Sequence, residues 1–495
     1  MMSSLSGRAT PPSLRRTRRE QTRRLLVLEK APPEWAGGNS YFTAGAVRMT
    51  YAGLEELRPI LEEMTDILAA ETVLPPYTKA DFAADRERVT QGRCDPELTS
   101  ILVEEATATW IWLHAKGVRF HLLYHRQAYR VGNTWQFWGG LAVGTVGGGQ
   151  GLMERHTAIA RANGIEIRYD SPVVDLLSDG QGRVTGVVVG RQEGREPIEA
   201  RSVVLASGGF EANPQLRAAY LGPNWDLAKV RGTPYNTGEG LMMALDRGAQ
   251  AYGNWSGCHA IAWDAQAPPT GDRLLTNRFS RQSYPVGLVV NAEGRRFLDE
   301  GADFRNYTYA KYGKEILRQP EGLAYQLFDQ KTVPLLRVED YHAPGATRVE
   351  APTIGDLARQ LGIDATALER TIAEYNAAVQ PGAFNPAIKD GQRTVGIQPP
   401  KSNWALTLDS PPYVAFPVTT GITFTFGGLR IDGDARVLDH ANRPIPGLYA
   451  AGELVGGLFY HNYPGGTGLT AGAVFGRRAG SAAASHAPSL EHVTA

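Results

Sequence analysis

The chain has 495 residues, more than one compact core usually holds, so we expect two closely packed lobes or one domain with a large insertion. Lys plus Arg and Asp plus Glu number 51 each, which excludes an overall basic field, and we predict no nucleic-acid partner. Cys94 and Cys258 are too few for a disulfide framework or a four-thiolate metal site, so we predict no metal and a cytoplasmic location. No apolar run approaches the roughly 20 residues that cross a bilayer.

The first 24 residues carry a strong excess of positive charge. Seven arginines between positions 8 and 24 face a single acid, Glu20. Such a segment cannot pack in a core, and we interpret residues 1–24 as a solvated or disordered arm. An organelle transit peptide would need an apolar helical face, which this segment lacks.

Strand and helix signals follow in chain order. The apolar run at 25–28 predicts a buried parallel strand that ends at the acid Glu29. Apolar residues at helical spacing predict helices over 54–67 and 98–113. Seven glycines between 139 and 151 indicate backbone that passes close to a ligand or to the start of a helix.

The middle of the chain changes from β-rich to helical. Short β-rich runs predict strands at 165–169, 173–176, 184–189 and 202–206. Residues 245–405 contain fewer such runs, and capped helical patterns occupy 353–361 and 365–378. Strand signals return after Pro411, and 447–480 is again rich in glycine. The N-terminal and C-terminal thirds of the chain share the pattern of short strands and glycine-rich turns. They therefore look like one domain that the middle of the chain interrupts.

Small residues follow the first predicted strand. They are Gly37, Gly38, Asn39, Ser40, Ala44 and Gly45. Glu29 has the position of the acid that accepts hydrogen bonds from an adenosine ribose in doubly wound folds, although a Glu at a strand end is often only solvated. Small residues next to it let backbone amides approach a diphosphate or a flavin ring.

Two later strand exits carry similar signals. Ala206, Ser207 and Gly208 leave the strand at 202–206, a pattern that also fits an ordinary turn. The segment 445–453 ends in Gly-Glu and resembles the second FAD signature of the flavoprotein reductases. That resemblance implies that Glu453 binds the ribityl chain of the cofactor.

The same resemblance extends to two further cofactor contacts. It implies that Gly468 and Leu469 start a helix that faces the pyrimidine end of the flavin, where a helix N-terminus stabilises negative charge. Val174, in the predicted meander, is assigned to the same cofactor.

The whole chain from about residue 26 resembles the fumarate reductase and succinate dehydrogenase flavoprotein superfamily, and within it the FAD-dependent tricarballylate dehydrogenases. The segments that carry this resemblance are 37–45, 220–240, 253–260, 299–313 and 456–472. It implies an α/β fold in which a Rossmann-like FAD-binding domain is interrupted by an α+β cap. We expect the FAD-binding domain at 25–245 and 410–485, the cap at 246–409 and a tail at 486–495. FAD is expected to be non-covalent, because the linking His of the superfamily is absent from 37–45.

The resemblance also implies which residues react. In the superfamily, an Arg shortly after a Val-Asn-x-x-Gly-x-Arg-Phe pattern delivers or accepts a proton opposite the flavin; the pattern occupies 290–297 here, and the matching residue is Arg305. An Arg that relays a proton needs a dry site and a neighbouring acid, for which Asp299, Glu300 and Asp303 are candidates. His259 matches a histidine that binds a substrate carboxylate.

The chain departs from the superfamily at two substrate positions. A second His is replaced by Phe424, and a carboxylate-binding Arg is replaced by Tyr463, which puts fumarate or succinate as substrate in doubt. The Tyr-Pro-Gly-Gly form at 463–466 resembles the 3-ketosteroid dehydrogenases, where the tyrosine polarises a carbonyl. We expect Tyr463 and His461, and less directly Tyr307, to contact substrate.

The implied reaction is the oxidation of tricarballylate to cis-aconitate, in which one carbon loses a proton and the adjacent carbon passes a hydride to flavin N5. The resemblance implies a separate membrane-associated iron–sulfur protein as electron acceptor, which would hold the enzyme at the membrane periphery. Alternatives are an enzyme similar to the ketosteroid dehydrogenases or to the fumarate reductases, and a polyanion-binding protein that acts through the basic arm.

The usual first strand with Gly-x-Gly-x-x-Gly does not occur before Glu29. The basic arm stands in its place, which is consistent with a shifted reading frame, a wrongly assigned start or a truncated paralogue. A helix N-terminus that binds the pyrophosphate would then be missing, so weak FAD affinity or a non-catalytic remnant is a further alternative.

Overall fold

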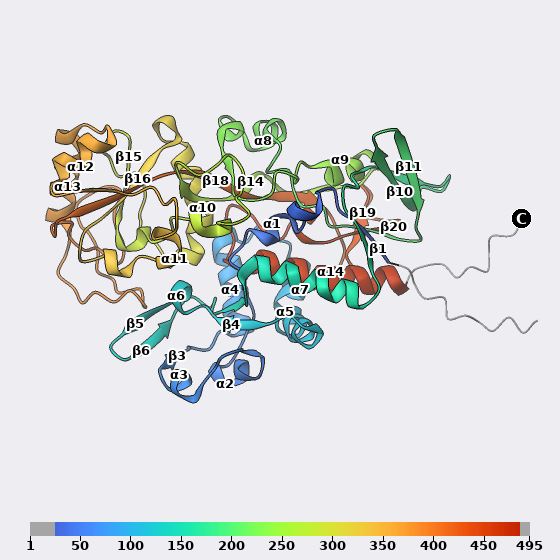
Figure 1. The fold of residues 1–495 in the computed structure, drawn as a ribbon, viewed down its shortest axis with the longest axis horizontal. Helices are drawn as coiled ribbons and strands as arrows, with labels where there is room; N and C mark the ends of the chain where they lie inside the picture. The colour runs from blue at the N-terminus through green and yellow to red at the C-terminus, as the bar shows by residue number, and fades with distance from the viewer. Residues whose placement is uncertain (1–24, 486–495) are drawn as a thin grey trace, which may run out of the picture.

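Two long antiparallel strands, β14 (Ala251–Asp264) and β18 (Tyr413–Leu429), run through the centre of the fold (Figure 1). The structure is a computed structural model and describes residues 25–485; the predicted arm at 1–24 and the tail at 486–495 lie outside this range. Strand β18 is rich in β-branched and aromatic residues and almost entirely buried, the composition of a strand covered on both faces.

The remaining strands are β1 (Leu26–Leu28), β2 (Ala46–Val47), β3 (Thr72–Val73), β4 (Phe120–Leu122), β5 (Ala128–Val131), β6 (Thr134–Phe137), β7 (Val143–Thr145), β8 (Glu166–Arg168), β9 (Val173–Ser178), β10 (Val184–Arg191), β11 (Gly194–Glu199), β12 (Val203–Leu205), β13 (Lys229–Val230), β15 (Leu288–Asn291), β16 (Ala324–Phe328), β17 (Val349–Ala351), β19 (Arg436–Leu438) and β20 (Pro444–Ala450). The helices are α1 (Gly38–Tyr41), α2 (Leu54–Leu57), α3 (Asp66–Ala70), α4 (Lys79–Thr90), α5 (Pro96–Lys116), α6 (Tyr124–Gln127), α7 (Gly148–Ala162), α8 (Pro214–Leu221), α9 (Glu239–Asp246), α10 (Tyr309–Leu317), α11 (Val338–Tyr341), α12 (Ile354–Leu361), α13 (Ala365–Ala378) and α14 (Thr467–Ser485).

Strands β1, β8, β12 and β20 form two separate parallel pairs. Strand β1 pairs in parallel with β8, and β12 pairs in parallel with β20. Within residues 25–485 no strand joins the two pairs into one sheet. Val27 on β1 and Val204 on β12 are about 40% exposed. Within the described residues, β1 and β12 are therefore edge strands of two separate small sheets.

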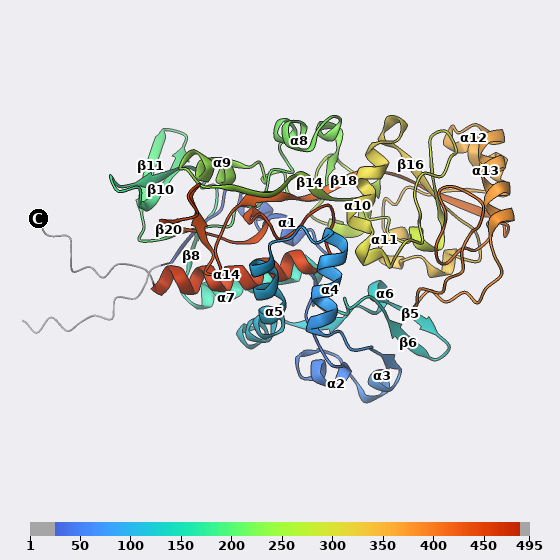
Figure 2. The same cartoon turned by 180° about the vertical axis from the view of Figure 1, so that it is seen from behind.

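Helix α14 and helix α5 form the helical layer beside this region (Figure 2). Asp95 caps α5 by accepting a hydrogen bond from the amide of Leu98, and Pro96 occupies the first turn. The two helices are joined where Trp110 Nε1 donates to Thr470 Oγ1 over 3.0 Å. Small and apolar residues are interspersed along α14 and allow this close approach, which fixes the N-terminus of the helix against the rest of the fold.

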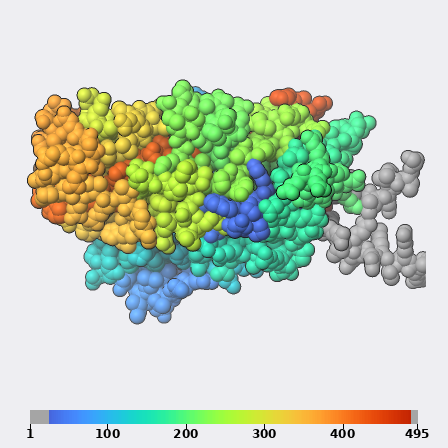
Figure 3. Space-filling model, turned by 45° about the horizontal axis from the view of Figure 1, so that its top comes forward, coloured from blue at the N-terminus to red at the C-terminus, as the bar shows by residue number. Residues whose placement is uncertain are grey.

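The middle of the chain forms one end of the molecule. Its yellow-to-orange surface gathers at the left of Figure 3. Strands β15, β16 and β17 pair with one another or with β18, and α12 and α13 pack with them around a separate apolar core. Thr353 and Asp364 cap the two helices, because each side chain accepts a hydrogen bond from a first-turn amide.

This six-stranded sheet crosses the expected domain boundaries. It joins β13 and β18, which lie in the expected FAD-binding segments, to β14, β15, β16 and β17, which lie in the expected cap. The division at residues 245 and 409 therefore falls beside strands that share one sheet, and it remains a prediction.

The predicted elements mostly match the structure. The helix expected over 98–113 is α5, and those expected over 353–361 and 365–378 are α12 and α13. The helix expected over 54–67 is wrong, because a 3-10 turn containing Pro59 ends α2 and a new helix starts only at Asp66. None of the helices within residues 25–485 is long and apolar enough to cross a membrane.

Candidate active site

Strands β14 and β18 bring His259 and Phe424 together. Their rings stack with centroids 5.2 Å apart, and the rings of Tyr309 and Tyr463 meet the imidazole edge-on at 4.9 and 4.8 Å. His259 is 1% exposed, and neither of its ring nitrogens has a hydrogen-bond partner within residues 25–485. A buried imidazole without a partner is costly and indicates that a ligand completes its hydrogen bonding.

The charge of His259 follows from its surroundings. Burial, and then the nearby positive charge of Arg231, lower the pKa of His259 well below its usual value. The imidazole is therefore neutral near pH 7. It can donate one hydrogen bond to a ligand but supplies no positive charge.

Tyr309 and Tyr463 form a hydroxyl pair beside this imidazole. Tyr309 begins α10, Tyr463 precedes α14, and their hydroxyl oxygens lie 2.5 Å apart. Burial raises the pKa of both phenols, so both keep their protons at neutral pH. One hydroxyl donates to the other, which leaves one O–H free to donate to a ligand oxygen.

Arg305 is buried without an acidic partner. Its Nη1 donates to Gln282 Oε1 over 3.1 Å, its Nη2 has no partner within residues 25–485, and its guanidinium lies 5.0 Å from the centre of the Trp138 ring. Burial, together with the positive charge of Arg126, lowers the pKa of Arg305. Both effects make this guanidinium easier to deprotonate than an exposed one.

The acids expected beside Arg305 do not contact it. Glu300 pairs with Arg296, Asp299 accepts a hydrogen bond from Ser402, and Asp303 pairs with Arg88 and Lys389; these three acids point into the expected cap or toward α4.

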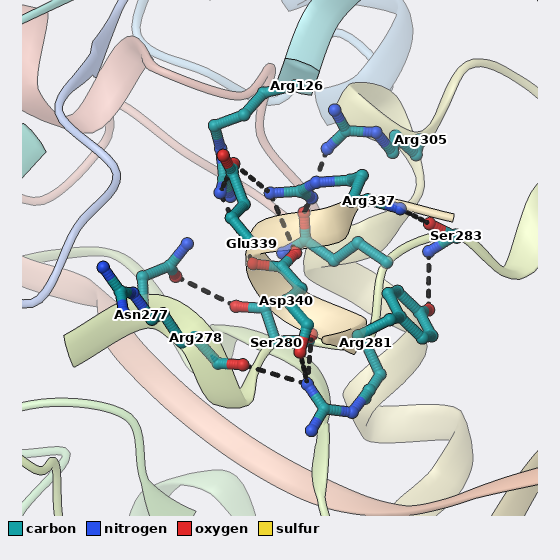
Figure 4. A network of polar contacts seen from close by, with 12 residues as sticks. Arg126, Asn277, Arg278, Ser280, Arg281, Ser283, Arg305, Arg337, Glu339 and Asp340 are labelled. Atoms are coloured by element: carbon teal, nitrogen blue, oxygen red, sulfur yellow. Dashed lines mark hydrogen bonds and ion pairs between the residues drawn. The ribbon is translucent and has the colours of Figure 1, made fainter. Parts of the chain in front are cut away.

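The acid nearest in the hydrogen-bond network of Arg305 is Asp340 (Figure 4). Gln282 Oε1 also accepts from Arg337 Nη1 over 2.7 Å, and Arg337 Nη2 lies 2.9 Å from Asp340. Arg126 lies on the other side of Asp340, at 3.4 Å, and also pairs with Glu339. Burial raises the pKa of Asp340 to about 6. Sequence reasoning missed this cluster because its charged members, Arg126, Arg337, Glu339 and Asp340, all lie more than thirty residues from Arg305.

A second buried arginine, Arg231, was also missed. It follows β13 and is 7% exposed; its Nε donates to Asn277 Oδ1 and its Nη1 donates to Thr423 Oγ1, each over 3.0 Å. No acid among the described residues lies within ion-pair distance of it. The only sequence signal was its place in the segment 220–240, which carries part of the family resemblance.

Two expected substrate contacts lie elsewhere. The Tyr307 hydroxyl lies between two acceptors, Gly139 O at 2.8 Å and the Asp85 carboxylate, and can donate its one hydrogen to either. Tyr307 lines a cavity of about 320 Å³ together with Tyr77 and Trp138. His461 is exposed, with its backbone in the left-handed region at φ 60°. The structure does not bring either residue to His259.

Several expected cofactor residues border open space. Gly37 and Gly38 have φ of 108° and 53°, and a Cβ built on Gly38 would meet nothing within 4 Å. Ala206 and Ser207 are exposed at the end of β12, where Gly208 has φ 75°. Positive φ and free space at these positions provide room for a ligand close to the backbone.

Other expected cofactor residues have protein partners. Glu29 accepts a hydrogen bond from the amide of Ala31 over 2.9 Å. The Asn39 amide group donates to Glu211 over 2.6 Å and to Thr423 O over 2.5 Å. Gly45 packs against Thr145 and Gly148, so a larger residue would not fit there. Ser40 lies in α1, Ala44 lies just before β2, and Val174 is 42% exposed on β9.

The first turn of α14 lies between the expected cofactor residues and the aromatic cluster around His259. A Cβ on Gly468 would lie 3.8 Å from Phe424 and 3.9 Å from Tyr463, and Leu469 follows in the same turn. The amides at this helix N-terminus are therefore next to the aromatic cluster that surrounds His259.

Glu453 forms a buried carboxyl pair with Glu211, a residue that sequence reasoning missed. Glu453 Oε1 accepts from the amide of Thr425 over 2.7 Å, and the two carboxyl groups hydrogen-bond with one another. Burial raises the pKa of both acids, so the pair holds a proton. Glu211 Oε2 has no other partner within residues 25–485.

Open glycines, exposed strand ends, a helix N-terminus and an unpartnered carboxyl oxygen fit the hydroxyl-rich and ring portions of FAD. Among the described residues, no group of three or more His, Cys, Asp or Glu side chains could hold a metal ion.

Comparisons with known proteins identify the class. The model of the FAD binding domain family matches residues 73–469. A probable fumarate reductase of Shewanella frigidimarina is 30% identical over 469 residues, which cover 94% of this chain and 71% of the relative. The open conformation of a flavocytochrome c3 fumarate reductase is similar with a TM-score of 0.68 and 27% identity, covering 94% of this chain and 74% of that one.

A more distant solved structure supports the fold. The 3-ketosteroid delta1-dehydrogenase of Sterolibacterium denitrificans, in complex with 1,4-androstadiene-3,17-dione, has a TM-score of 0.70 at 22% identity and covers 93% of this chain and 95% of that one. The chain is an FAD-dependent oxidoreductase with the α/β fold of the flavoproteins. It belongs to the FAD binding domain family, whose members similar to this chain are dehydrogenases and reductases that act on carbon–carbon bonds.

Proposed function

We propose that this chain oxidises a small polycarboxylate, tricarballylate, to cis-aconitate. The observation that supports this most strongly is that two buried groups are incompletely bonded, His259, whose ring meets the Tyr309–Tyr463 hydroxyl pair, and Arg305, whose charge acts on Tyr309. An anion with oxygen atoms directed at these donors would satisfy them and neutralise the guanidinium.

Each residue has a defined role in this proposal. Neutral His259 donates a hydrogen bond to a carboxylate oxygen, and the Tyr463 hydroxyl donates to a second oxygen that gains charge during reaction. Arg305 holds or moves the proton at the carbon next to that carboxylate, which its lowered pKa favours. FAD, when bound, supplies the acceptor of the hydride that leaves the adjacent carbon.

The family resemblance also supports a non-covalent FAD and a separate electron acceptor. FAD is held non-covalently by Gly37, Gly38, Asn39, Ser40, Ala44, Gly45, Val174, Ala206, Ser207, Gly208, Glu453, Gly468 and Leu469, with Glu29 at the ribose. The expected cap at 246–409 encloses the substrate, and electrons leave to a separate membrane-associated iron–sulfur protein.

A ketone substrate is the second candidate. The hydroxyl pair of Tyr309 and Tyr463 could polarise a carbonyl oxygen, and a solved relative of similar fold binds a steroid dione. Two buried arginines, Arg231 and Arg305, argue against an uncharged steroid, because an apolar ligand would leave their charges unneutralised. Reduction of fumarate is a third candidate, in which Arg305 and His259 would act in the opposite direction; Phe424 and Tyr463 stand in place of two of the residues expected to bind fumarate.

The test is the visible absorption spectrum of the purified full-length chain, before and after anaerobic addition of tricarballylate. We expect a flavin spectrum that bleaches with tricarballylate and not with 4-androstene-3,17-dione. A flavin spectrum that bleaches only with the steroid would favour the ketone reaction. A colourless protein would contradict the proposal and support a remnant without cofactor.

The role of Arg305 has its own test. Arg305→Ala is expected to reduce kcat by at least about 100-fold, the range of one general acid or base, with FAD still bound. Arg318→Ala, at an exposed arginine that ends α10, is the matched control. Near wild-type turnover by Arg305→Ala would remove Arg305 from the mechanism.

A further inference from the structure

Arg231 is a buried cation whose contacts within the described residues are all neutral. Burying a guanidinium without a counter-charge is costly. Two other arginines with buried side chains have acid partners, Arg281 at 2.6 Å from Asp264 and Arg296 at 2.5 Å from Glu300, and the buried Arg217 instead donates to four backbone carbonyl oxygens. Arg231 has only the side-chain oxygens of Asn277 and Thr423. An anion supplied from outside the chain would remove this imbalance.

The donors of Arg231 are not all used. A guanidinium carries five N–H groups. Nε and one N–H of Nη2 point to the single oxygen Asn277 Oδ1, and one N–H of Nη1 points to Thr423 Oγ1. One N–H on each Nη atom is left, which is the fork geometry that binds a carboxylate.

The position of Arg231 puts it in the same site as His259. Thr423, its partner, directly precedes Phe424, which stacks on the His259 ring. Its charge acts on the imidazole of His259 and on the phenols of Tyr309 and Tyr463. Arg305 acts on Tyr309 as well, so the two unpaired guanidiniums approach the same hydroxyl pair from different elements of the fold.

We propose that Arg231 binds a second carboxylate of the substrate, and that Arg231 and Arg305 together select compounds with at least two carboxylates. This deepens the proposed function and rests on it. Because the imidazole of His259 is neutral, it cannot balance a second negative charge, and Arg231 is the group that can. It supplies a cation from the end of β13 in a site where Phe424 and Tyr463 offer none.

The test measures binding separately from turnover. Isothermal titration calorimetry on the full-length protein compares tricarballylate, succinate and butanoate, which carry three, two and one carboxylates. For the wild type we expect butanoate to bind at least about 10-fold more weakly than succinate. Equal affinity for succinate and butanoate would overturn the proposal without any variant.

Variants then locate the effect. Arg231→Gln is expected to weaken tricarballylate and succinate binding by about 10- to 100-fold and to leave butanoate binding unchanged, because one charged hydrogen-bonding contact is lost. Arg231→Lys retains the charge and better preserves the fold, so its affinity for tricarballylate and succinate is expected to fall less than that of Arg231→Gln. Arg430→Gln, just beyond the far end of β18 and bonded to Asn442, is the matched control and should bind all three ligands as the wild type does.

Two results would distinguish a failure of the Arg231 carboxylate site from a failure of the proposed oxidation of tricarballylate. Loss of bound flavin in Arg231→Lys, with unchanged discrimination between succinate and butanoate, would assign Arg231 to the cofactor and overturn the proposal. If tricarballylate does not bleach the flavin but the carboxylate dependence and its loss in Arg231→Gln are observed, the proposed reaction fails and Arg231 remains a carboxylate site.

Discussion

The hydroxyl oxygens of Tyr309 and Tyr463 lie 2.5 Å apart, at the edge of the His259 ring. They come from segments about 150 residues apart, one at the start of α10 and one in the loop before α14. Since burial keeps both phenols protonated, the pair acts as a single donor whose free O–H is held in place by the other hydroxyl.

Removing one hydroxyl from this pair should slow the reaction more than it weakens binding. We expect Tyr463→Phe to lower kcat by about 10- to 100-fold and to change KM less, because the donor acts mainly on charge that develops in the transition state. Steady-state kinetics with a quantified flavin content would measure this. Tyr375→Phe, at a buried tyrosine whose hydroxyl donates to Leu406 O, is the matched control. A pure KM effect in Tyr463→Phe would make the residue a binding group only.

The Glu211–Glu453 pair should make stability depend on pH. A carboxyl whose pKa is raised on folding takes up protons as the chain folds, so its contribution to stability is complete below about pH 4.5 and falls as the pH rises from there toward the raised pKa of the folded pair. The amide introduced by Glu211→Gln would still accept the hydrogen bonds from Asn39 and Asn236, and it remains neutral at every pH. Thermal melting of Glu211→Gln should therefore show a gain in Tm that grows from pH 5 to pH 8, by on the order of 1 to 3 °C.

The control for this pair is Glu193→Gln, an exposed position in the turn between β10 and β11. Its Tm should follow the wild type at both pH values. A Glu211→Gln variant with the same Tm difference at pH 5 and pH 8 would mean that the pair carries no extra proton.

The parts of the fold that sequence predicted are those with local signals. The apolar spacing of α5 and the caps Thr353 and Asp364 are visible in the sequence because they depend on near neighbours. The break at Pro59 was misjudged because apolar spacing continues through it. Helix α14 was expected at Gly468 through its resemblance to a family signature.

The parts of the site that sequence missed depend on tertiary contacts. Arg305 and His259 were singled out through family resemblance. Arg231, which follows β13, and Asp340, which lies in α11, can be recognised as site residues only once the fold brings them close to Arg305 and His259. The acids near Arg305 in sequence, such as Glu300, pair with other residues. Charge pairing between distant segments has no spacing rule that a single sequence displays.

A buried lysine in the expected cap gives a stability prediction of opposite sign. Burial lowers the pKa of Lys401 to about 8, so above this value the folded chain holds the lysine neutral while the unfolded chain still binds a proton up to about 10.5. Stability should therefore rise with pH between 8 and 10.5, and the desolvation cost is complete below pH 8. Lys401→Met removes that cost and should raise Tm at pH 7 by on the order of 1 to 3 °C.

The comparison for Lys401→Met is Lys331→Met. Lys331 pairs with Asp329 and Asp409 and its pKa is raised, so its loss should lower Tm or leave it unchanged. The gain in Lys401→Met should shrink as the pH is raised from about 7 to about 10. A gain that is constant with pH would mean that packing, rather than charge burial, is responsible.

The two cysteines should react with iodoacetamide at very different rates. Cys258 is 8% exposed on β14, and burial raises the pKa of its thiol, so little thiolate forms near neutral pH. Cys94 is half-buried; against the effect of burial, the charge of Arg86 and a hydrogen bond from Thr90 at 3.3 Å lower the pKa of its thiol. At pH 8, peptide mass spectrometry should find Cys94 alkylated at least about 10-fold faster than Cys258. Cys94→Ser should abolish the fast phase and leave the slow one, and a Cys258 that reacts as fast as Cys94 would contradict the buried position of β14 next to His259.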